Sequence, residues 1–549
     1  MNLWAGTILL LPLAPLLVAV MLVRPKALRL ATGLLPLLPL PGVLAAFAAP
    51  EATSIELSAL VLGLTLGLDQ AGRVFLIFTA MIWCAVGWHL WLTRPWEEKG
   101  GRRFLFCYLV AMSGNFGVLL SLEYIAYYVF FSMLSFAAYG IVVTRDDEAV
   151  RKAGRLYLAL AILGEMAMLG GFMLAAAGVA GLSMVLLLYF GMGVKHAVLP
   201  LHVWLPRAHG TAPTPASALL SSTLLKAGLL GWMRFMPLAG NEALSAFAAP
   251  MLVLGLGAAF YGALCGVLQD RPKMLLGYSS VSQMGIATAA FATAAPSSAV
   301  WEAVAALLLL FVLHHALVKA ALFLSTGVRR RGASGGWVWP VLLLLSLALV
   351  GVPGTGGYFA KAMLESRLEQ WGVGWAYQLL PLTSIATALL MARFLWLMRH
   401  EPGAYPGVAQ AHVSPAPFLA LSVLALLLPW GVLFVVHPQP LEVVSGLVTL
   451  KSWLPPTVGI VLGLIGWWLA LRGLTLSWRV PPGDIVLPLE HALERLVHWP
   501  LRAPRMPNLP RLPQPDRVET ALRRFSVLGI CYLLLLLVFA VLAGALRGF

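Results

Sequence analysis

The residues best suited to chemistry in this chain are ionisable side chains inside long apolar segments. A lysine at the centre of a membrane-spanning helix costs about 2.5–3.5 kcal/mol, so such residues usually mark ion or proton pathways. Histidine titrates near neutral pH, and a desolvated lysine beside other cations can exchange its proton in the same range. The pattern therefore predicts a proton pathway. Its predicted members are Lys195, Lys226, His315, Lys319, Lys361, Glu165, Glu123, His196 and His209.

Two breaks in apolar segments are expected to position these residues. Lys195 precedes a break at Pro200, and Lys361 follows the glycine-rich stretch 351–357. Corresponding broken helices in two halves of a chain are typical of inverted repeats with a transport site between them. His315 and Lys319 share a helix face because they are four residues apart. Lys195 and His196 point about 100° apart, so at most one of them faces a given axis.

The composition indicates a membrane protein. Of 549 residues, 60% are hydrophobic and 11% are charged, which is typical of a polytopic membrane chain. The net charge of +15 lies in no solvated basic domain, so no nucleic-acid binding is expected. The cysteines Cys84, Cys107, Cys265 and Cys531 lie in apolar segments without metal-ligand spacing. No phosphate loop, dinucleotide fingerprint or CxxC pair is found, so we expect no cofactor and no metal.

Segments of about 20 apolar residues predict an all-α polytopic fold with about sixteen transmembrane helices. They are 3–23, 27–49, 72–93, 103–121, 123–143, 154–178, 180–199, 212–236, 247–268, 273–294, 300–327, 337–366, 375–398, 415–437, 456–474 and 524–547. The first lacks a basic start, so no cleavable signal is expected. Four regions follow: helices 1–3 in 1–100, a first inverted repeat (helices 4–8) in 101–240, a second (helices 9–13) in 241–400, and C-terminal helices in 401–549.

The predicted loops alternate in charge. One set carries clusters of Lys and Arg, including Arg271 and Lys273, and the other is nearly free of them and carries carboxylates such as Glu242 and Glu302. The positive-inside rule then predicts a bacterial-type inner membrane protein with both termini on the periplasmic side. The Pro/Arg-rich segment 475–523 would be cytoplasmic, where it could be solvated, bind anionic lipid headgroups or dock on a partner.

Four stretches resemble a known family. The run LPLHVWLPRAHGTAPTPASALLSSTLLKAGLLGWMRF is similar to the signature of the proton-conducting antiporter-like membrane subunits of respiratory complex I, Mrp sodium/proton antiporters and membrane-bound hydrogenases. QDRPKMLLGYSSVSQMG, HALVKAALFLSTG and SLALVGVPGTGGYFAKAMLES follow in the family's order. The form PRAH…LLKAG is closer to the Mrp D-type and hydrogenase branch than to the complex I subunit with the long lateral helix.

The resemblance implies a fold and roles. It implies a core of about fourteen helices with two inverted five-helix repeats and broken helices 7 and 12. Lys195 and Lys226 would be the lysines of the seventh and eighth helices. His315 and Lys319 would be the pair of the eleventh helix, and Lys361 the lysine near the exit half-channel.

The chain departs from this family at one residue of the predicted pathway. The family's fifth-helix glutamate, which pairs with the seventh-helix lysine, would fall at Ser132. Lys195 thereby loses its usual counter-ion, and Glu165 or Glu123 could substitute for it. Glu123 lies about 13 Å along a helix from Ser132, so it could not act from the same place.

The sequence and the resemblance together predict a proton-translocating subunit of a multi-subunit membrane complex. Its partners would be other membrane subunits, with a cytoplasmic subunit as a further candidate. The chain lacks a cluster-binding cysteine set, so any redox reaction of a translocase or hydrogenase complex would belong to a partner. Three alternatives stay open: Na⁺/H⁺ exchange in an Mrp-like assembly, a proton-coupled partner of an inorganic-carbon uptake complex, and a structural subunit in which Ser132 reflects lost conduction.

Overall fold

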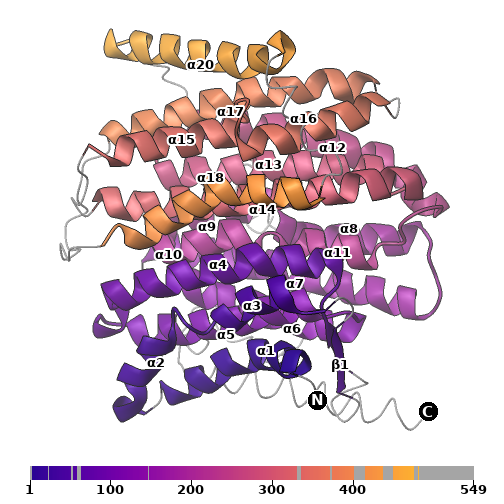
Figure 1. Ribbon diagram of the computed structural model, residues 1–549, viewed down its shortest axis with the longest axis vertical. Helices are drawn as coiled ribbons and strands as arrows, with labels where there is room; N and C mark the ends of the chain where they lie inside the picture. Colours follow the sequence, from indigo (N-terminus) through magenta and orange to yellow (C-terminus); the bar gives the residue numbers. More distant parts are fainter. Residues whose placement is uncertain are drawn as a thin grey trace, which may run out of the picture.

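A computed structural model shows a mostly helical chain with long helices running side by side (Figure 1). The structure describes residues 3–22, 24–50, 53–57, 64–145, 147–330, 336–370, 374–400, 414–436, 449–474 and 480. The predicted segment 475–523, apart from residue 480, and the predicted helix 524–547 lie outside these residues.

Eleven helical stretches among the described residues are long and apolar enough to cross a membrane. They are α1 (Leu3–Met21), α4 (Gln70–Thr93), α5 (Gly101–Leu120), α6 (Tyr124–Val142), α7 (Glu148–Ala176), α8 (Leu182–His196) with α9 (Trp204–Thr211), α12 (Glu242–Val267), α14 (Ser298–Arg330), α17 (Gly374–His400), α18 (Ala416–Val436) and α20 (Leu450–Leu471). The predicted polytopic helical class is confirmed. The total of about sixteen helices, counted at about 20 residues each, stays a prediction.

The region before α4 differs from the prediction. Instead of one helix over 27–49, the chain forms α2 (Leu28–Leu34) and α3 (Leu40–Ala48), because Pro36 and Pro39 cannot continue a helix between them. Strands β1 (Ser54–Leu57) and β2 (Leu64–Gly67) then form an antiparallel hairpin. The prediction contained no strand here. Two short 3₁₀ turns, η1 (Pro25–Ala27) and η2 (Pro95–Glu97), lie at other connections.

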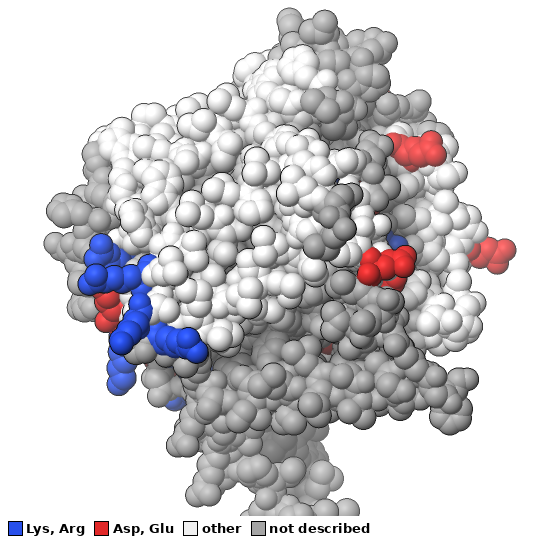
Figure 2. All heavy atoms as spheres, turned by 60° about the horizontal axis from the view of Figure 1, so that its bottom comes forward, with Lys and Arg blue, Asp and Glu red and all other residues white. Residues whose placement is uncertain are grey.

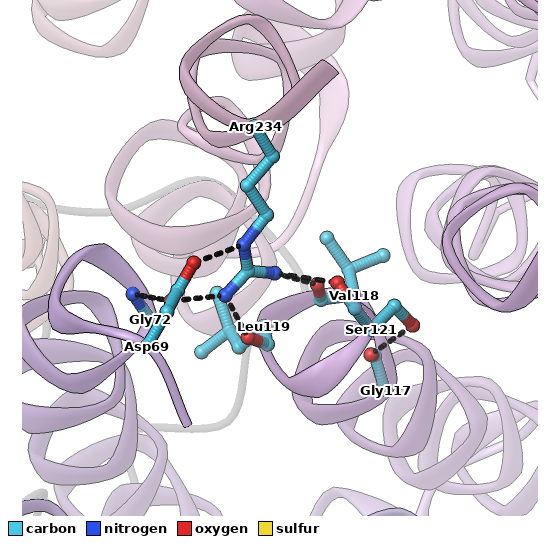
Figure 3. A network of polar contacts seen from close by, with 7 residues as sticks. All are labelled: Asp69, Gly72, Gly117, Val118, Leu119, Ser121 and Arg234. Carbon is cyan, nitrogen blue, oxygen red and sulfur yellow. Dashed lines mark hydrogen bonds and ion pairs between the residues drawn. The ribbon is translucent and has the colours of Figure 1, made fainter. Parts of the chain in front are cut away.

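A charged clamp fixes the hairpin end of α4 to two other helices (Figure 3). Asp69 caps α4 through the backbone N–H of Gly72 and accepts bonds from Arg234 Nε at 2.9 Å and Nη2 at 2.6 Å. Arg234 is at the end of α11 (Ala227–Phe235) and also donates to the carbonyls of Val118, Leu119 and Ser121 at the end of α5. Burial alone would raise the pKa of Asp69, but the Arg234 guanidinium holds that pKa below its ordinary value. The pair therefore ties three elements together at one end of the bundle.

Glycines let α12 pack closely against α13 (Pro272–Ala294). A Cβ atom at Gly255 would lie 2.7 Å from the backbone nitrogen of Ala289, and one at Gly262 would lie 2.6 Å from that of Ser282. Small residues permit this backbone-to-backbone approach between membrane helices. The packing holds α13, which is buried along nearly its whole length, in the interior of the bundle.

Two apolar helices are interrupted. α8 ends at His196, with Ala197 in the left-handed conformation at φ 60°, and the chain passes through η3 (Leu201–Val203) into α9. A non-glycine residue in this conformation costs about 1–3 kcal/mol. α15 (Val338–Val350) ends at Gly351, φ 86°, and α16 (Gly356–Gln370) continues after it. Each interruption leaves backbone carbonyls that need donors in apolar surroundings.

A third irregularity follows α9. α10 (Thr214–Leu219) leads into a π-helical turn, η4 (Leu220–Leu224), before α11 begins. Single π-helical turns within helices occur frequently at functional sites.

The two ends of the bundle differ in charge. Figure 2 shows Lys and Arg gathered at one edge of the visible face and Asp and Glu mainly toward the opposite edge. Exposed Arg94, Arg145 and Lys152 lie at the first end, called here the basic end, and exposed Glu242 and Glu302 lie at the other. The asymmetry behind the predicted orientation is present in the fold, while the orientation itself stays a prediction.

Candidate functional site

Lys195 is buried one residue before the end of α8, with hydroxyl groups around its ammonium. Its Nζ atom donates to Ser135 Oγ at 2.7 Å and to the Tyr157 hydroxyl at 2.9 Å. It also lies 5.2 Å from the ring centroid of Phe131 and 5.3 Å from that of Tyr157. Hydroxyl acceptors and aromatic faces both stabilise an ammonium. Helices α6 and α7 therefore build a cradle for this lysine.

Glu165 supplies the carboxylate beside this cradle. It projects from α7, is 5% exposed, and interacts electrostatically with Lys195. Ser132 and Ser135 of α6 lie within interaction range of the same carboxylate. Glu165 therefore reaches, from the neighbouring helix, the region that a glutamate at position 132 would serve.

The structure does not place Glu123 beside Lys195. It lies half-buried at the start of α6, and its carboxylate accepts a hydrogen bond from Thr65 of β2. Among the described residues, its contact is thus with the hairpin at the end of the bundle. Of the two carboxylates considered for Lys195, the geometry favours Glu165.

Lys226 occupies the centre of the site. It is fully buried directly before α11, and its Nζ atom donates to the carbonyl of Ser221 in the π-helical turn. A carbonyl released by the irregular turn thus becomes the partner of the buried ammonium. Lys226 also interacts electrostatically with His196, His315 and Lys319.

Neighbouring residues Lys195 and His196 face different parts of the site. Lys195 points to α6 and α7, whereas the imidazole of His196 packs on Trp232 of α11, with ring centroids 4.9 Å apart, and interacts with Lys226. The helical angle of about 100° between adjacent residues produces this split. Together the two side chains connect the cradle of α6 and α7 with Lys226.

His315 and Lys319 extend the group along α14. The Nζ atom of Lys319 donates to the carbonyl of Leu276 on α13 at 2.6 Å. Both ring nitrogens of His315 are buried without a protein hydrogen-bond partner, as are those of His209. Ordered water is the usual partner of such buried groups. These imidazoles are therefore suited to exchanging protons with water.

Lys361 and His314 lie at the second interruption. The Nζ atom of Lys361, on α16, donates to the carbonyl of Val350 at the end of α15, 3.2 Å away. The Nε2 atom of His314, on α14, is 3.1 Å from the carbonyl oxygen of Ala348, which also lies on α15. His314 interacts electrostatically with Lys361 on one side and with His315 on the other. It therefore connects Lys361 with the centre of the site.

His209 and Lys273 form a branch toward the basic end. His209, on α9, stacks on Phe323 with ring centroids 4.4 Å apart and interacts with Lys319, Lys273 and Lys226. The loop analysis counted Lys273 as a basic loop residue, and this is wrong. It is 5% exposed, lies in the first turn of α13, and donates to the carbonyl of Ala212 at the end of α9.

These residues form a continuous series of buried ionisable groups, called here the buried row. It consists of Glu165, Lys195, His196, Lys226, Lys319, His315, His314 and Lys361. Two charges 4 Å apart interact by about 4 kcal/mol at an effective dielectric of 20, so a change of protonation at one member acts on the next. No cluster of three or more His, Cys, Asp or Glu suited to a metal ion occurs in the described ranges.

Some members of the site were missed by the sequence reasoning. Ser135 and Tyr157 carry no signal of their own in apolar segments, because their role depends on which helix faces Lys195. His314 stands beside the predicted His315, and its place in an apolar segment does not distinguish a pathway histidine from a packed one. Lys273 is the first residue of the predicted helix 273–294, so its place in a helix was predicted, and only its burial against α9 was not.

The chain is similar to known membrane subunits. Residues 121–389 match the family described as NADH:quinone oxidoreductase/Mrp antiporter, TM. The chain is 29% identical over 338 residues to hydrogenase-4 component B of Escherichia coli (strain K12), covering 54% of this chain and 50% of that protein. It is 29% identical over 378 residues to Na(+)/H(+) antiporter subunit A1 of Staphylococcus saprophyticus, covering 59% of this chain and 46% of that protein. The chain thus spans about half the length of these curated relatives.

Solved structures share the fold. A chain of the Mrp complex from Dietzia sp. DQ12-45-1b superimposes with a TM-score of 0.67 at 20% identity, over 84% of this chain and all of that chain (100%). A chain of respiratory complex I from Thermus thermophilus with bound NADH gives 0.64 at 23% identity, over 80% of this chain and 98% of that chain.

Proposed function

The chain belongs, through residues 121–389, to the NADH:quinone oxidoreductase/Mrp antiporter family of membrane subunits, and we propose that it is the proton-translocating subunit of a multi-subunit membrane complex. The observation that carries this proposal is the buried row, in which Glu165 interacts with Lys195 and a series of electrostatic interactions runs from His196, the chain neighbour of Lys195, to Lys361. Such groups are expensive inside a membrane, and proton relays are among the functions that keep them there.

The proposed path runs along this row. Protons reach Lys226, move between Lys195 and Lys361 through water and imidazoles, and leave from the Lys361 half. Protonation of one lysine repels protons from its neighbours, so charge moves stepwise along the row. Glu165 acts as the counter-ion of Lys195 in place of the missing carboxylate at Ser132. His209 and Lys273 offer a connection from the row toward the basic end.

The coupled reaction belongs to partners. The two similar relatives are named as a component of a hydrogenase and as a subunit of an antiporter. We therefore place the chain beside other membrane subunits in a bacterial-type inner membrane, with the basic end toward the cytoplasm by the positive-inside rule. A cytoplasmic partner would meet the basic end.

Sodium/proton exchange is the second candidate function, because one relative is named a Na(+)/H(+) antiporter subunit. Sodium, a hard cation, is expected to prefer oxygen ligands, as Ca²⁺ and Mg²⁺ do. The buried row offers one carboxylate and otherwise nitrogen-bearing side chains. This composition favours protons as the ion that moves along the row itself.

Potential-driven proton uptake tests the proposal. The complex, purified with its co-purifying subunits, is placed in vesicles, and a potassium gradient with valinomycin drives protons past a trapped pH dye. Lys361→Ala should slow uptake by about 100-fold, the scale of one lost acid–base group, while the exposed control Lys152→Ala should match wild type. Wild-type uptake in an assembled Lys361→Ala complex would instead favour a structural subunit that has lost conduction.

A further inference from the structure

Helices α17 and α20 pack side by side and run in the same direction (Figure 1). A Cβ atom at Gly459 would lie 2.6 Å from that of Ala388. Further along both helices, the indole nitrogen of Trp467 donates to the carbonyl of Ala392 at 2.9 Å. The contacts advance along both helices together, so the last turns of α17 and α20 lie next to each other.

These last turns are at the basic end of the bundle. Arg393, near the end of α17, donates to the carbonyl of Gln269 at 3.1 Å and lies 3.4 Å from the carboxylate of Asp270. Both partners belong to the connection between α12 and α13. Since α12 begins at Glu242, at the opposite end of the bundle, this connection lies at the basic end. The ends of α17 and α20 therefore lie there as well.

Exposed arginines stand at the ends of both helices. Arg399 is in the last turn of α17, beside His400, whose ring stacks on Trp396. Arg472 directly follows α20, and its guanidinium carbon lies 4.2 Å from the ring centroid of Trp468. A guanidinium stacked on a ring keeps its N–H donors at its edge, where they can bind a phosphate. Neither α17 nor α20 contains Asp or Glu.

The outer face of α20 has the pattern of a helix in contact with lipid. Exposed Lys451 and Arg472 stand about 31 Å apart along the axis at 1.5 Å per residue, which matches the roughly 30 Å hydrocarbon core of a bilayer. Exposed Trp453 and Trp468 lie just inside them, as in the aromatic belts of membrane helices. Between the tryptophans, exposed apolar side chains include Val461, Leu462, Leu464 and Ile465. Trp468 and Arg472 are thus at the depth of the lipid headgroups.

We propose that Arg399, Trp468 and Arg472 form a binding site for the headgroup of an anionic phospholipid at the basic end, called here the headgroup site. The phosphate oxygens accept hydrogen bonds from the two guanidinium groups, and the acyl chains lie along the apolar outer face of α20. This site goes beyond the proposed function and does not depend on it.

Both parts of a phospholipid have a counterpart at this surface. A phosphodiester supplies a negative charge and acceptor oxygens, which arginine forks bind strongly. Basic surfaces between membrane helices on the cytoplasmic side are known to hold anionic headgroups. The apolar face beside the arginines fits acyl chains, which inorganic phosphate lacks. The combination therefore favours a lipid as the occupant.

Native mass spectrometry tests the headgroup site. The full-length chain, purified in detergent with the subunits that accompany it, is titrated with dioleoyl phosphatidylglycerol. At the lowest lipid concentration that saturates the wild type, Arg399→Gln combined with Arg472→Gln should retain one lipid fewer per copy of this chain, because losing both arginines weakens binding by about tenfold or more.

A matched control removes two exposed arginines elsewhere at the basic end. Arg94→Gln combined with Arg145→Gln should retain as many lipids as the wild type. With zwitterionic dioleoyl phosphatidylcholine, all three proteins should retain equal numbers.

Three results would overturn the headgroup site. The first is an equal number of phosphatidylglycerol molecules on the wild type and on the variant that lacks Arg399 and Arg472. The second is displacement of the additional lipid by excess inorganic phosphate, which would indicate a site for small anions. The third is loss of an accompanying subunit from the same variant, which would identify this surface as a protein interface.

Discussion

The Nζ atom of Lys195 lies 2.7 Å from Ser135 Oγ, one helical turn beyond Ser132, the position of the missing glutamate. The carboxylate that acts on this ammonium comes instead from Glu165 on α7. We propose that Glu165, on α7, serves as counter-ion in place of the carboxylate that the resemblance implies at position 132. Its consequences can be measured.

A pair of substitutions tests the relocation of the counter-ion. Glu165→Gln should slow proton uptake by about tenfold or more, because Lys195 then has no carboxylate beside it. Ser132→Glu alone should leave uptake unchanged, since Glu165 already serves the lysine. Added to Glu165→Gln, it should restore the rate. If uptake in the double variant is no faster than in Glu165→Gln, the two positions do not serve the same lysine.

The Asp69–Arg234 clamp should contribute to stability in a pH-dependent way. Asp69→Asn leaves the guanidinium of Arg234 without its counter-charge. We expect a loss of about 2 kcal/mol at pH 7, less than the roughly 3–5 kcal/mol of a fully buried pair, because the Asp69 side chain is 37% exposed. Thermal unfolding in detergent, followed by tryptophan fluorescence, measures the difference.

The sign of the pH effect follows from the pKa of Asp69, which is lower in the folded chain than its ordinary value. The clamp therefore contributes its stability above about pH 4 and loses it as the pH falls through the folded-state pKa. The Tm difference between wild type and Asp69→Asn should shrink over that window. Glu148→Gln, which breaks an exposed pair with Lys152, should leave Tm unchanged. A difference that stays constant down to pH 3 would show that Arg234 does not act through the charge of Asp69.

The close packing of α12 on α13 predicts unequal effects of two neighbouring glycines. Gly255→Ala forces a methyl group against the backbone of α13, and overpacking of this kind costs about 1–3 kcal/mol. At Gly257 the nearest atom to an added Cβ is 3.9 Å away, so Gly257→Ala should be tolerated. Melting temperatures of the two variants should therefore separate. Equal melting temperatures would mean that α12 can shift away without cost.

The composition of the buried row also predicts that proton uptake does not require sodium. Because nitrogen-bearing side chains dominate the row, proton uptake should run at the same rate when choline replaces sodium on both sides of the vesicle membrane. A rate that falls with sodium removal and recovers on its return would favour the exchange function.

Much of the site could be predicted because lysine and histidine are rare inside apolar segments. Lys195, Lys226, Lys319 and Lys361 stand out for that energetic reason, and the prolines and glycines beside two of them mark the interruptions. Their partners could not be predicted, since carbonyls such as those of Leu276 and Val350 have no side-chain signature. Lys273 was counted among the basic loop residues because the sequence of a helix start does not show whether a lysine there faces water or the protein interior. The hairpin at β1 and β2 was missed because its pairing depends on two short strands too weak to show a pattern.

Proton uptake by vesicles that carry the complex with Lys226→Ala tests the central claim most directly. Lys226 interacts with members from both halves of the row, so its loss should slow uptake by about 100-fold while the subunits still co-purify and Lys152→Ala behaves as wild type. A Lys226→Ala complex that assembles and takes up protons at the wild-type rate would contradict conduction along the buried row.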